Sequence, residues 1–326
     1  MADAIVVKQL TKTFGETVAV RDLDLSVPEG ALYGVIGPNG AGKTTMIRMI
    51  LSILFPDRGE LRVLGRASAL EAKDRIGYLP EERGLYKKMK VGDFLVYMGR
   101  LKGLDGPDLQ AAVKRWLERV GLGAVEKKPC EELSKGMQQK VQFITAVIHR
   151  PDLLILDEPF SGLDPVNQRL LRDLVLEEHR RGATVLFSTH VMFHAEQLCE
   201  QVVMIHQGRK VLDQAVATIG ASYDPRSIVF EPFNPAADVQ IIRSMPGVRG
   251  ITRDGGSWDI ALEEGADASK VIQQVVSVLP PSRIEVRRPT LEDVFIRIVT
   301  DGAEADDLSK LRAALREDDA AQGVKL

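Results

Sequence analysis

Runs of β-branched and apolar residues alternate with helical patterns over about the first 213 residues. The clearest strand-like runs are LYGVIG at 32–37, DLLILD at 152–157, ATVLFS at 183–188 and QVVMIHQ at 201–207. Alternation of strands with helical segments is typical of βαβ units. The pattern therefore predicts an α/β core with a largely parallel sheet.

The pattern changes between about residues 90 and 150, where helical periodicity replaces strand-like runs. The predicted helices are VGDFLVYMGRLKG at 91–103, DLQAAVKRWLERVGL at 108–122 and KGMQQKVQFITAVIHR at 135–150. No convincing strand lies among them. We interpret this stretch as a helical subdomain inserted into the α/β core, whose predicted extent is residues 1–215.

A second, smaller α+β domain is predicted over residues 216–300. Its pattern predicts strands at 227–233, 247–254, 257–263 and 283–288, with helices at 236–245 and 267–279. The resulting βαββαβ order indicates the split βαβ, ferredoxin-like arrangement. A short helix follows from Thr290, a suitable N-cap residue. Residues 301–326 are acidic and short of large apolar residues, which predicts a flexible tail or a frayed helix.

Composition adds limits to this picture. The chain has 326 residues, 44% of them hydrophobic, enough for a sizeable core and two domains. A net charge of −3 gives no reason to expect a nucleic-acid partner. Two cysteines, Cys130 and Cys199, without paired spacing favour a reducing compartment. No signal-peptide pattern is present, and the longest apolar run, interrupted by Arg48, is too short to cross a bilayer, so we expect a soluble chain.

The strongest motif for chemistry is GPNGAGKTT, which matches G-x-x-x-x-G-K-[ST] between a predicted strand and a helix. Small residues let backbone N–H groups surround phosphate oxygens, and the following helix adds a positive dipole. Lys43 is predicted to reach the β and γ phosphates, and the Thr44 hydroxyl to bind magnesium. The predicted nucleotide-binding residues are Gly37, Pro38, Asn39, Gly40, Ala41, Gly42, Lys43, Thr44 and Thr45.

A second motif, LLILDEP, ends a strand-like run in two carboxylates. Asp157 is predicted to hold magnesium, and Glu158 to orient or deprotonate the attacking water. An acidic pair at a strand end is by itself often a turn or a helix cap. Downstream of a phosphate loop, the functional interpretation is preferred.

Five motifs in this order, GPNGAGKTT, ELSKGMQQK, LLILDEP, SGLDP and LFSTH, resemble the ATP-binding subunit of an ATP-binding cassette (ABC) transporter. The resemblance covers residues 4–215 and implies a P-loop ATPase core of ABC type that binds ATP and Mg²⁺. It also implies a homodimer, because Ser134 and Gly136 of the signature motif cap the γ-phosphate on the opposite subunit in that family.

The same resemblance assigns roles to three further residues. Asp164 is similar to the residue at the dimer seam, and His190 to the switch histidine that contacts the γ-phosphate. Phe14 matches the aromatic residue that stacks on adenine, although a packing role is the competing interpretation. His190 and His194 are four residues apart, as zinc ligands can be, but no glutamate follows His190 and no third ligand is evident, which disfavours zinc.

The chain departs from the family pattern in two places. The signature is LSKGM in place of the common L-S-G-G-Q, so Lys135 and Met137 replace glycine and glutamine. In GYLPEERGLY, Glu81 stands where the family normally has glutamine. A carboxylate binds a metal more strongly than an amide oxygen does, so Glu81 is predicted to be a magnesium-side ligand, and Glu82 only solvated.

The segment RRPTLEDVFIRIV resembles the C-terminal part of ATPases from ABC-2 type exporters. That resemblance implies separate integral-membrane permease subunits, docked around residues 78–103, and a peripheral location on the cytoplasmic face of the membrane. Two alternatives stay open: a soluble ABC ATPase acting in translation or DNA repair, and a cassette gated by ligand binding to residues 216–300.

Overall fold

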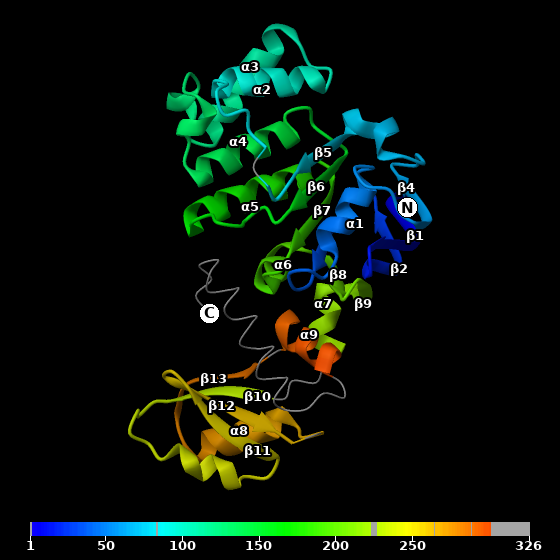
Figure 1. The fold of residues 1–326 in the computed structure, drawn as a ribbon. Coiled ribbons are helices and arrows are strands. Elements are labelled where there is room, and N and C mark those ends of the chain that lie inside the picture. The colour runs from blue at the N-terminus through cyan, green and yellow to red at the C-terminus, as the bar shows by residue number, and fades with distance from the viewer. Residues whose placement is uncertain (1, 83, 223–226, 264, 288, 301–326) are drawn as a thin grey trace. The chain divides into compact units, whose positions relative to one another are not determined.

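The structure is a computed structural model that describes residues 2–82, 84–222, 227–263, 265–287 and 289–300. It contains two compact units, one built mainly from Met1–Val216 and the other from Ala217–Arg297. Figure 1 shows the elements of each unit. The predicted acidic tail, residues 301–326, lies outside the described residues.

The central sheet of the first unit has six strands in the order β5-β6-β7-β3-β8-β9. All neighbours pair in parallel except β9, which is antiparallel to β8 at the edge. The bounds are β3 Leu32–Ile36, β5 Ile76–Leu79, β6 Leu153–Asp157, β7 Thr184–Thr189, β8 Gln201–His206 and β9 Arg209–Ala215. The largely parallel sheet and its four predicted strands are confirmed. The carboxyl ends of β3 and β6 therefore meet at one edge, where open α/β sheets bind ligands.

A second sheet of the first unit, not among the predicted elements, is antiparallel. Its strands are ordered β2-β1-β4, with bounds β1 Asp3–Phe14, β2 Thr17–Pro28 and β4 Arg58–Val63. In β2, buried Leu23, Leu25 and Val27 alternate with exposed polar residues. Alternation with a period of two is typical of a strand that is buried on one face only. It is a weaker signal in the sequence than a continuous apolar run.

Helices flank the central sheet and form the predicted insertion between β5 and β6. The insertion contains α2, α3 and α4, and the helical subdomain is confirmed (Figure 1). Helices α2 and α4 lie inside their predicted ranges, whereas α3 begins at Gly106, two residues before its predicted start. Helix α4 returns from the insertion and packs beside β5. The bounds are α1 Lys43–Ile50, α2 Val91–Leu101, α3 Gly106–Arg119, α4 Lys135–Val147, α5 Pro165–Arg180 and α6 Met192–Leu198. Helix α7, Val216–Ser222, starts at the last residue of this part of the first unit and otherwise belongs to the second unit.

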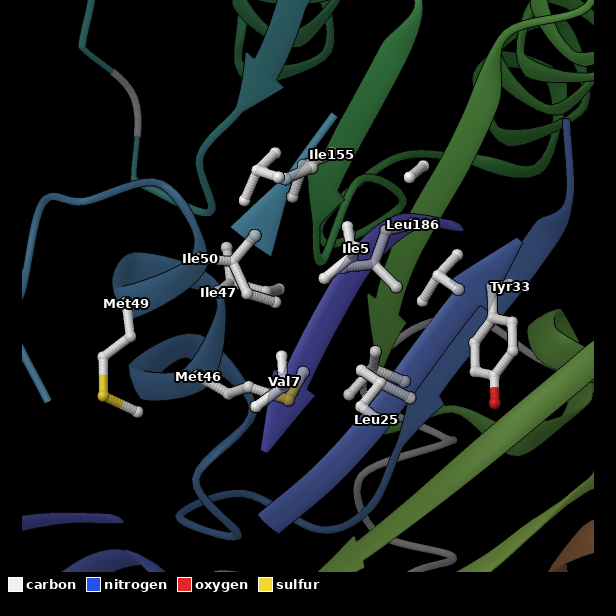
Figure 2. Close-up of a cluster of buried hydrophobic side chains, with 14 of the residues drawn as sticks. Ile5, Val7, Leu25, Tyr33, Met46, Ile47, Met49, Ile50, Ile155 and Leu186 are labelled. Carbon is white, nitrogen blue, oxygen red and sulfur yellow. The ribbon is translucent and has the colours of Figure 1, made fainter. Parts of the chain in front are cut away.

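A hydrophobic cluster joins α1 to both sheets of the first unit. Figure 2 shows side chains from α1, β1, β2 and the central sheet gathered there, among them Ile5, Ile47 and Leu186. All three are completely buried. Shortening such a side chain to alanine typically costs about 2–5 kcal/mol. This packing fixes the start of α1 relative to the ends of the strands.

The second unit is a four-stranded antiparallel sheet in the order β11-β12-β10-β13. This is the strand order that the predicted ferredoxin-like βαββαβ arrangement requires. Its core contains Ile228, Phe230 and Val275. The first helix, predicted at 236–245, is instead the 3₁₀ helix η4, which begins after an Asp238 side chain that accepts from Gln240 N. The bounds are β10 Ser227–Pro232, η4 Val239–Ser244, β11 Val248–Asp254, β12 Ser257–Leu262, α8 Ala268–Val278 and β13 Pro281–Arg287.

Helix α9 (Leu291–Thr300) begins with a reciprocal cap. The Thr290 hydroxyl accepts a hydrogen bond from Asp293 N at 3.1 Å, and an Asp293 carboxylate oxygen accepts from Thr290 N at 3.0 Å. The two side chains thus satisfy two backbone donors that the helix leaves free. Thr290 is therefore the N-cap that the sequence predicts.

Candidate nucleotide site

The phosphate loop connects β3 to α1 and is built around glycines that no other residue could replace. Gly37 has φ of 150°, and a Cβ there would lie 2.1 Å from the carbonyl oxygen of Ile205. Gly42 has φ of 105°, and its Cβ would lie 2.3 Å from the carbonyl oxygen of Ala19. The backbone of the loop thus runs against β2 and β8, and it turns into α1 with its amide groups at the helix start.

Lys43, the first residue of α1, is buried with 6% of its surface exposed. Its Nζ donates to the carbonyl oxygens of Gly37 at 2.7 Å and Pro38 at 3.1 Å, and lies 3.6 Å from Glu158 Oε1. Burial lowers the pKa of Lys43, and the carboxylates of Glu158 and Asp157 oppose part of this shift. The ammonium group is therefore held over the loop by groups that phosphate oxygens could replace.

Asp157 ends β6 beside Thr44 and Ser188. Its Oδ1 accepts from Ser188 Oγ at 2.5 Å and from Thr44 Oγ1 at 3.3 Å. Its Oδ2 is buried and has no hydrogen-bond partner among the described residues. Burial raises the pKa of Asp157, and the two hydroxyl hydrogen bonds oppose the rise. A free carboxylate oxygen next to a hydroxyl is a donor set that fits Mg²⁺, which prefers hard oxygen ligands.

Glu158 follows in a left-handed conformation with φ of 47°, uncommon for a residue other than glycine. Its amide donates to the carbonyl oxygen of Ser188 at 3.2 Å. Its Oε1 lies 2.9 Å from His190 Nδ1. The turn thus places the carboxylate between Lys43 and His190, two of the residues predicted to act with it.

A cavity of about 620 Å³ lies over the phosphate loop. Residues 39–45, Glu81 and Glu158 line it, so the structure brings most of the predicted nucleotide residues to one place. Burial, and then the negative charges of Asp157 and Glu158, raise the pKa of Glu81. The negative charges of Asp157 and Glu158 therefore reach Glu81 at this end of the cavity, which makes it unfavourable for an unaccompanied phosphate.

Phe14 lies at the end of β1 and is 49% exposed. It does not line the cavity, but it pairs with Thr17, which does. Lys12 Nζ lies 5.6 Å from the centre of its ring. An exposed ring at the rim is accessible for stacking, and its role toward adenine stays a prediction.

Several residues around the site were not predicted from sequence. Ser188 pairs with Asp157 in the parallel register of β6 and β7 and donates to its carboxylate. A polar residue at the end of the strand LFS would have indicated it. Arg21 and Arg209 also line the cavity. They come from β2 and β9, and no spacing in the sequence links them to the phosphate loop.

The predicted signature residues lie on the surface instead. Ser134 is exposed and caps α4, because its hydroxyl accepts from Met137 N at 3.3 Å. Asp164 is also exposed and caps α5, accepting from Val166 N and Asn167 N. A Cβ at Gly136 would lie 3.4 Å from the Asn167 side chain, so the two helix starts are neighbours. None of the three predicted residues lines the cavity of the same chain.

His190 and His194 do not form a zinc site among the described residues, where no cluster of three metal-ligating side chains is found. The His194 ring packs edge-on against Phe160, with ring centres 5.0 Å apart. Burial lowers the pKa of His194 to about 4. The two histidines therefore have different surroundings, one at Glu158 and one in apolar packing.

Comparison with known families agrees with this geometry. A family model described as ABC transporter matches residues 20–161, and one described as ATP-binding protein DrrA1-3-like, C-terminal domain, matches residues 216–299. An uncharacterised ABC transporter ATP-binding protein, YhaQ of Bacillus subtilis, is 42% identical over 90% of this chain and 98% of its own length. The Nod factor export ATP-binding protein I of Paraburkholderia xenovorans is 36% identical over 93% and 99%.

Solved structures show the same fold. The ATP-binding subunit of an ABC transporter matches with a TM-score of 0.63 and 30% identity, over 67% of this chain and 92% of its own. A bacterial ABC transporter cassette, MJ0796, determined as a dimer, matches with a TM-score of 0.61 and 22% identity, over 65% and 98%. The cassette fold is therefore shared.

Proposed function

The chain belongs to the ATP-binding proteins of ABC transporters, and from that premise we propose that two copies, closed around two MgATP, drive export through a separate membrane permease. It is an ATPase. The observation that carries the mechanism is the meeting of Lys43, Glu158 and His190 beside the phosphate loop, with contacts of 3.6 and 2.9 Å to one carboxylate oxygen.

In the proposed reaction a water molecule attacks the γ-phosphorus as the bond to the ADP oxygen breaks. Glu158 takes the proton of that water, and His190, which lies beside the carboxylate, contacts the γ-phosphate. Lys43 Nζ leaves its carbonyl partners in the loop for the phosphate oxygens. Thr44 and Asp157 would hold Mg²⁺, with Glu81 as a further ligand, and the metal would supply positive charge against that of the phosphates.

The arrangement of the signature supports a pair of chains. Ser134, Gly136 and Asp164 are grouped at two adjacent helix starts, outside the cavity of their own chain. Helix N-termini are anion sites, and an exposed one can meet a phosphate carried by another molecule. A homodimer in which each signature faces the other chain's phosphate loop would complete both sites, and the similar cassette MJ0796 is described as dimeric.

The region 78–103 supports docking of a permease. Tyr86 and Leu101 are exposed there, and Tyr86 packs edge-on against Phe94 and Tyr97 with ring centres 5.9 Å apart. Exposed aromatic and aliphatic side chains of this kind are typical of interaction surfaces. Among the described residues no helix is long and apolar enough to span a bilayer. We infer a peripheral position on the cytoplasmic side, held by the permease, and export is the activity named for the Nod factor relative.

Replacement of the proposed base tests the mechanism. Glu158→Gln should lower kcat by about 10²–10⁴-fold, because loss of general-base catalysis typically has an effect of that order. Steady-state ATPase assays would measure the loss, and size-exclusion chromatography should show dimers accumulating with MgATP.

A matched control is Glu178→Gln. Glu178 of α5 is also a buried glutamate, but it pairs with Arg181, the residue that follows α5, and does not line the cavity. It should retain ATPase activity. Undiminished turnover in Glu158→Gln would refute the role of Glu158.

A further inference from the structure

Helix α4 carries two buried glutamines, Gln139 and Gln142, that the mechanism does not use. They are 2% and 4% exposed. Three residues apart, they lie on neighbouring positions of one helix face. A buried amide is costly unless its polar atoms find hydrogen-bond partners, so the partners of these two side chains show what the helix holds.

Each glutamine donates to a backbone carbonyl directly after an acid of the site. Gln139 Nε2 donates to the carbonyl oxygen of Pro159 at 3.0 Å. Gln142 Nε2 donates to the carbonyl oxygen of Glu82 at 3.2 Å. Pro159 follows Glu158, and Glu82 follows Glu81.

We call each of these hydrogen bonds a tether, and both loops that they hold, the one at Glu158 and the one at Glu81, need to be fixed in place. The segment at Glu158 is held in a left-handed turn, and Glu81 stands on the exposed loop that follows β5. Each carboxylate carries negative charge toward the other within the same cavity. Because the two carboxylates repel each other, a fixed distance between Glu81 and Glu158 requires that other parts of the chain hold their backbones in place.

We propose that Gln139 and Gln142 are positioning residues, through which α4 sets the places of Glu158 and Glu81. Helix α4 is a single rigid element that begins at Ser134. A displacement of its start therefore moves both acid-bearing loops together. That last step rests on the proposed function, because it requires a second chain to bind at Ser134, whereas the tethering itself requires only this chain.

The two tethers predict different defects in ATP hydrolysis. Gln139→Met should lower kcat about fivefold with KM for ATP within about twofold, because only the alignment of Glu158 is disturbed. Gln142→Met should raise the magnesium concentration for half-maximal activity about fivefold, because Glu81 is displaced. A merely structural role predicts no such division.

Lys140→Met provides the matched control. Lys140 lies between the two glutamines in sequence and also ties α4 to another element, since its Nζ donates to the carbonyl oxygen of Val120 at 3.1 Å. That tether reaches neither acid-bearing loop. The control variant should keep the parent kcat, KM and magnesium requirement.

Hydrogen exchange of the nucleotide-free full chain, read by mass spectrometry, tests the tethers without catalysis. Gln142→Met should speed exchange at residues 81–82 and not at 160–163, and Gln139→Met should do the reverse. Uniform exchange, or the same pattern as Lys140→Met, would overturn the proposal.

Two further observations separate a failure of this proposal from a folding defect and from a failure of the proposed function. If methionine at position 142 prevents folding, Gln142→Asn withdraws the amide by one methylene group and must give the same local change. Failure of the parent chain to hydrolyse ATP would count against the proposed function alone, because the exchange result stands without it.

Discussion

The phosphate loop and the signature surface are both built at helix starts, yet their surroundings are opposite. At α1, Lys43 and Glu158 are buried and held by contacts within the chain. At α4 and α5, Ser134 and Asp164 are exposed, and their side chains accept hydrogen bonds from the first turns of their own helices. The phosphate loop is thus a preorganised part of the nucleotide site, which we call the buried half-site. The signature surface consists of two capped helix starts that a second molecule can reach.

The contrast between the phosphate loop and the signature surface shows where this molecule buries charged side chains. Buried charges are costly, and the first unit accepts them at the end of the sheet because Lys43 lies beside the carboxylates of Asp157 and Glu158 and offsets part of their charge. The described core cluster of the second unit consists of hydrophobic residues such as Ile228 and Phe230. In the first unit, buried charges of both signs gather at the phosphate loop, while the buried Glu178 is paired with Arg181 away from it.

The largest expected effect is at the buried half-site. Lys43→Met should weaken ATP binding by the isolated chain about 10- to 100-fold, because hydrogen bonds to charged groups are worth about 1.5–3 kcal/mol. Equilibrium titration with a fluorescent ATP analogue would measure it. Unchanged affinity would contradict the assignment of Nζ to the phosphates.

A smaller effect, of a different kind, is expected at the signature surface. Ser134→Ala should leave ATP affinity of the isolated chain within about twofold, while steady-state ATPase falls about tenfold because the pair no longer closes. It should also lower the free energy of unfolding by about 1 kcal/mol through loss of the cap.

Asp267→Ala separates these two effects. Asp267 caps α8 in the second unit, accepting from Ser269 N at 2.9 Å. Loss of this cap should lower the free energy of unfolding by about 1 kcal/mol, as in Ser134→Ala, and leave ATPase activity intact. If Ser134→Ala weakened ATP binding as strongly as Lys43→Met does, the contrast between the two regions would fail.

The smallest expected effect is at Glu81. Glu81→Gln should keep ATPase activity within about threefold, because the amide also offers an oxygen to the metal. Since the folded state raises the pKa of Glu81, its contribution favours folding below the ordinary pKa and is lost as pH rises through the raised value. In metal-free buffer the variant should therefore have a higher Tm than the parent at pH 7, with no difference near pH 4.

Glu82→Gln is the matched control for that experiment. Its side chain is 88% exposed and lies 3.9 Å from Arg48, a loose surface pair. Such pairs contribute little, so Tm should not change at either pH. A difference between Glu81→Gln and the parent that grows on acidification would show that the pKa of Glu81 is shifted in the other direction.

Much of the fold could be predicted from local pattern. Continuous apolar runs identify β3, β6, β7 and β8, and the order of elements identifies the ferredoxin-like second unit. The antiparallel sheet of β1, β2 and β4 was missed because its strands are covered on one face, which halves their apolar signal. The helix expected at 236–245 is a short 3₁₀ helix starting after Asp238, whose side chain binds the backbone locally.

The site was only partly predictable for a related reason. Gly37, Lys43 and Thr44 lie within eight residues of the chain, and the positive φ of Gly37 demands a glycine there. Ser188 reaches Asp157 only through the register of β6 and β7. Gln139 and Gln142 read as ordinary polar positions of a helix until the structure shows their carbonyl partners.

The sequence alone predicts which residues carry the chemistry, because phosphate binding and metal binding need particular side chains at particular spacings. The tertiary structure alone decided which of them meet: strand order joins Lys43 to Glu158 and His190, and leaves Ser134 and Asp164 outside. It also decided that Glu81 shares the cavity with Glu158, residues 77 positions apart in the chain. Contacts between distant segments depend on how strands and helices pack, and no local pattern records that.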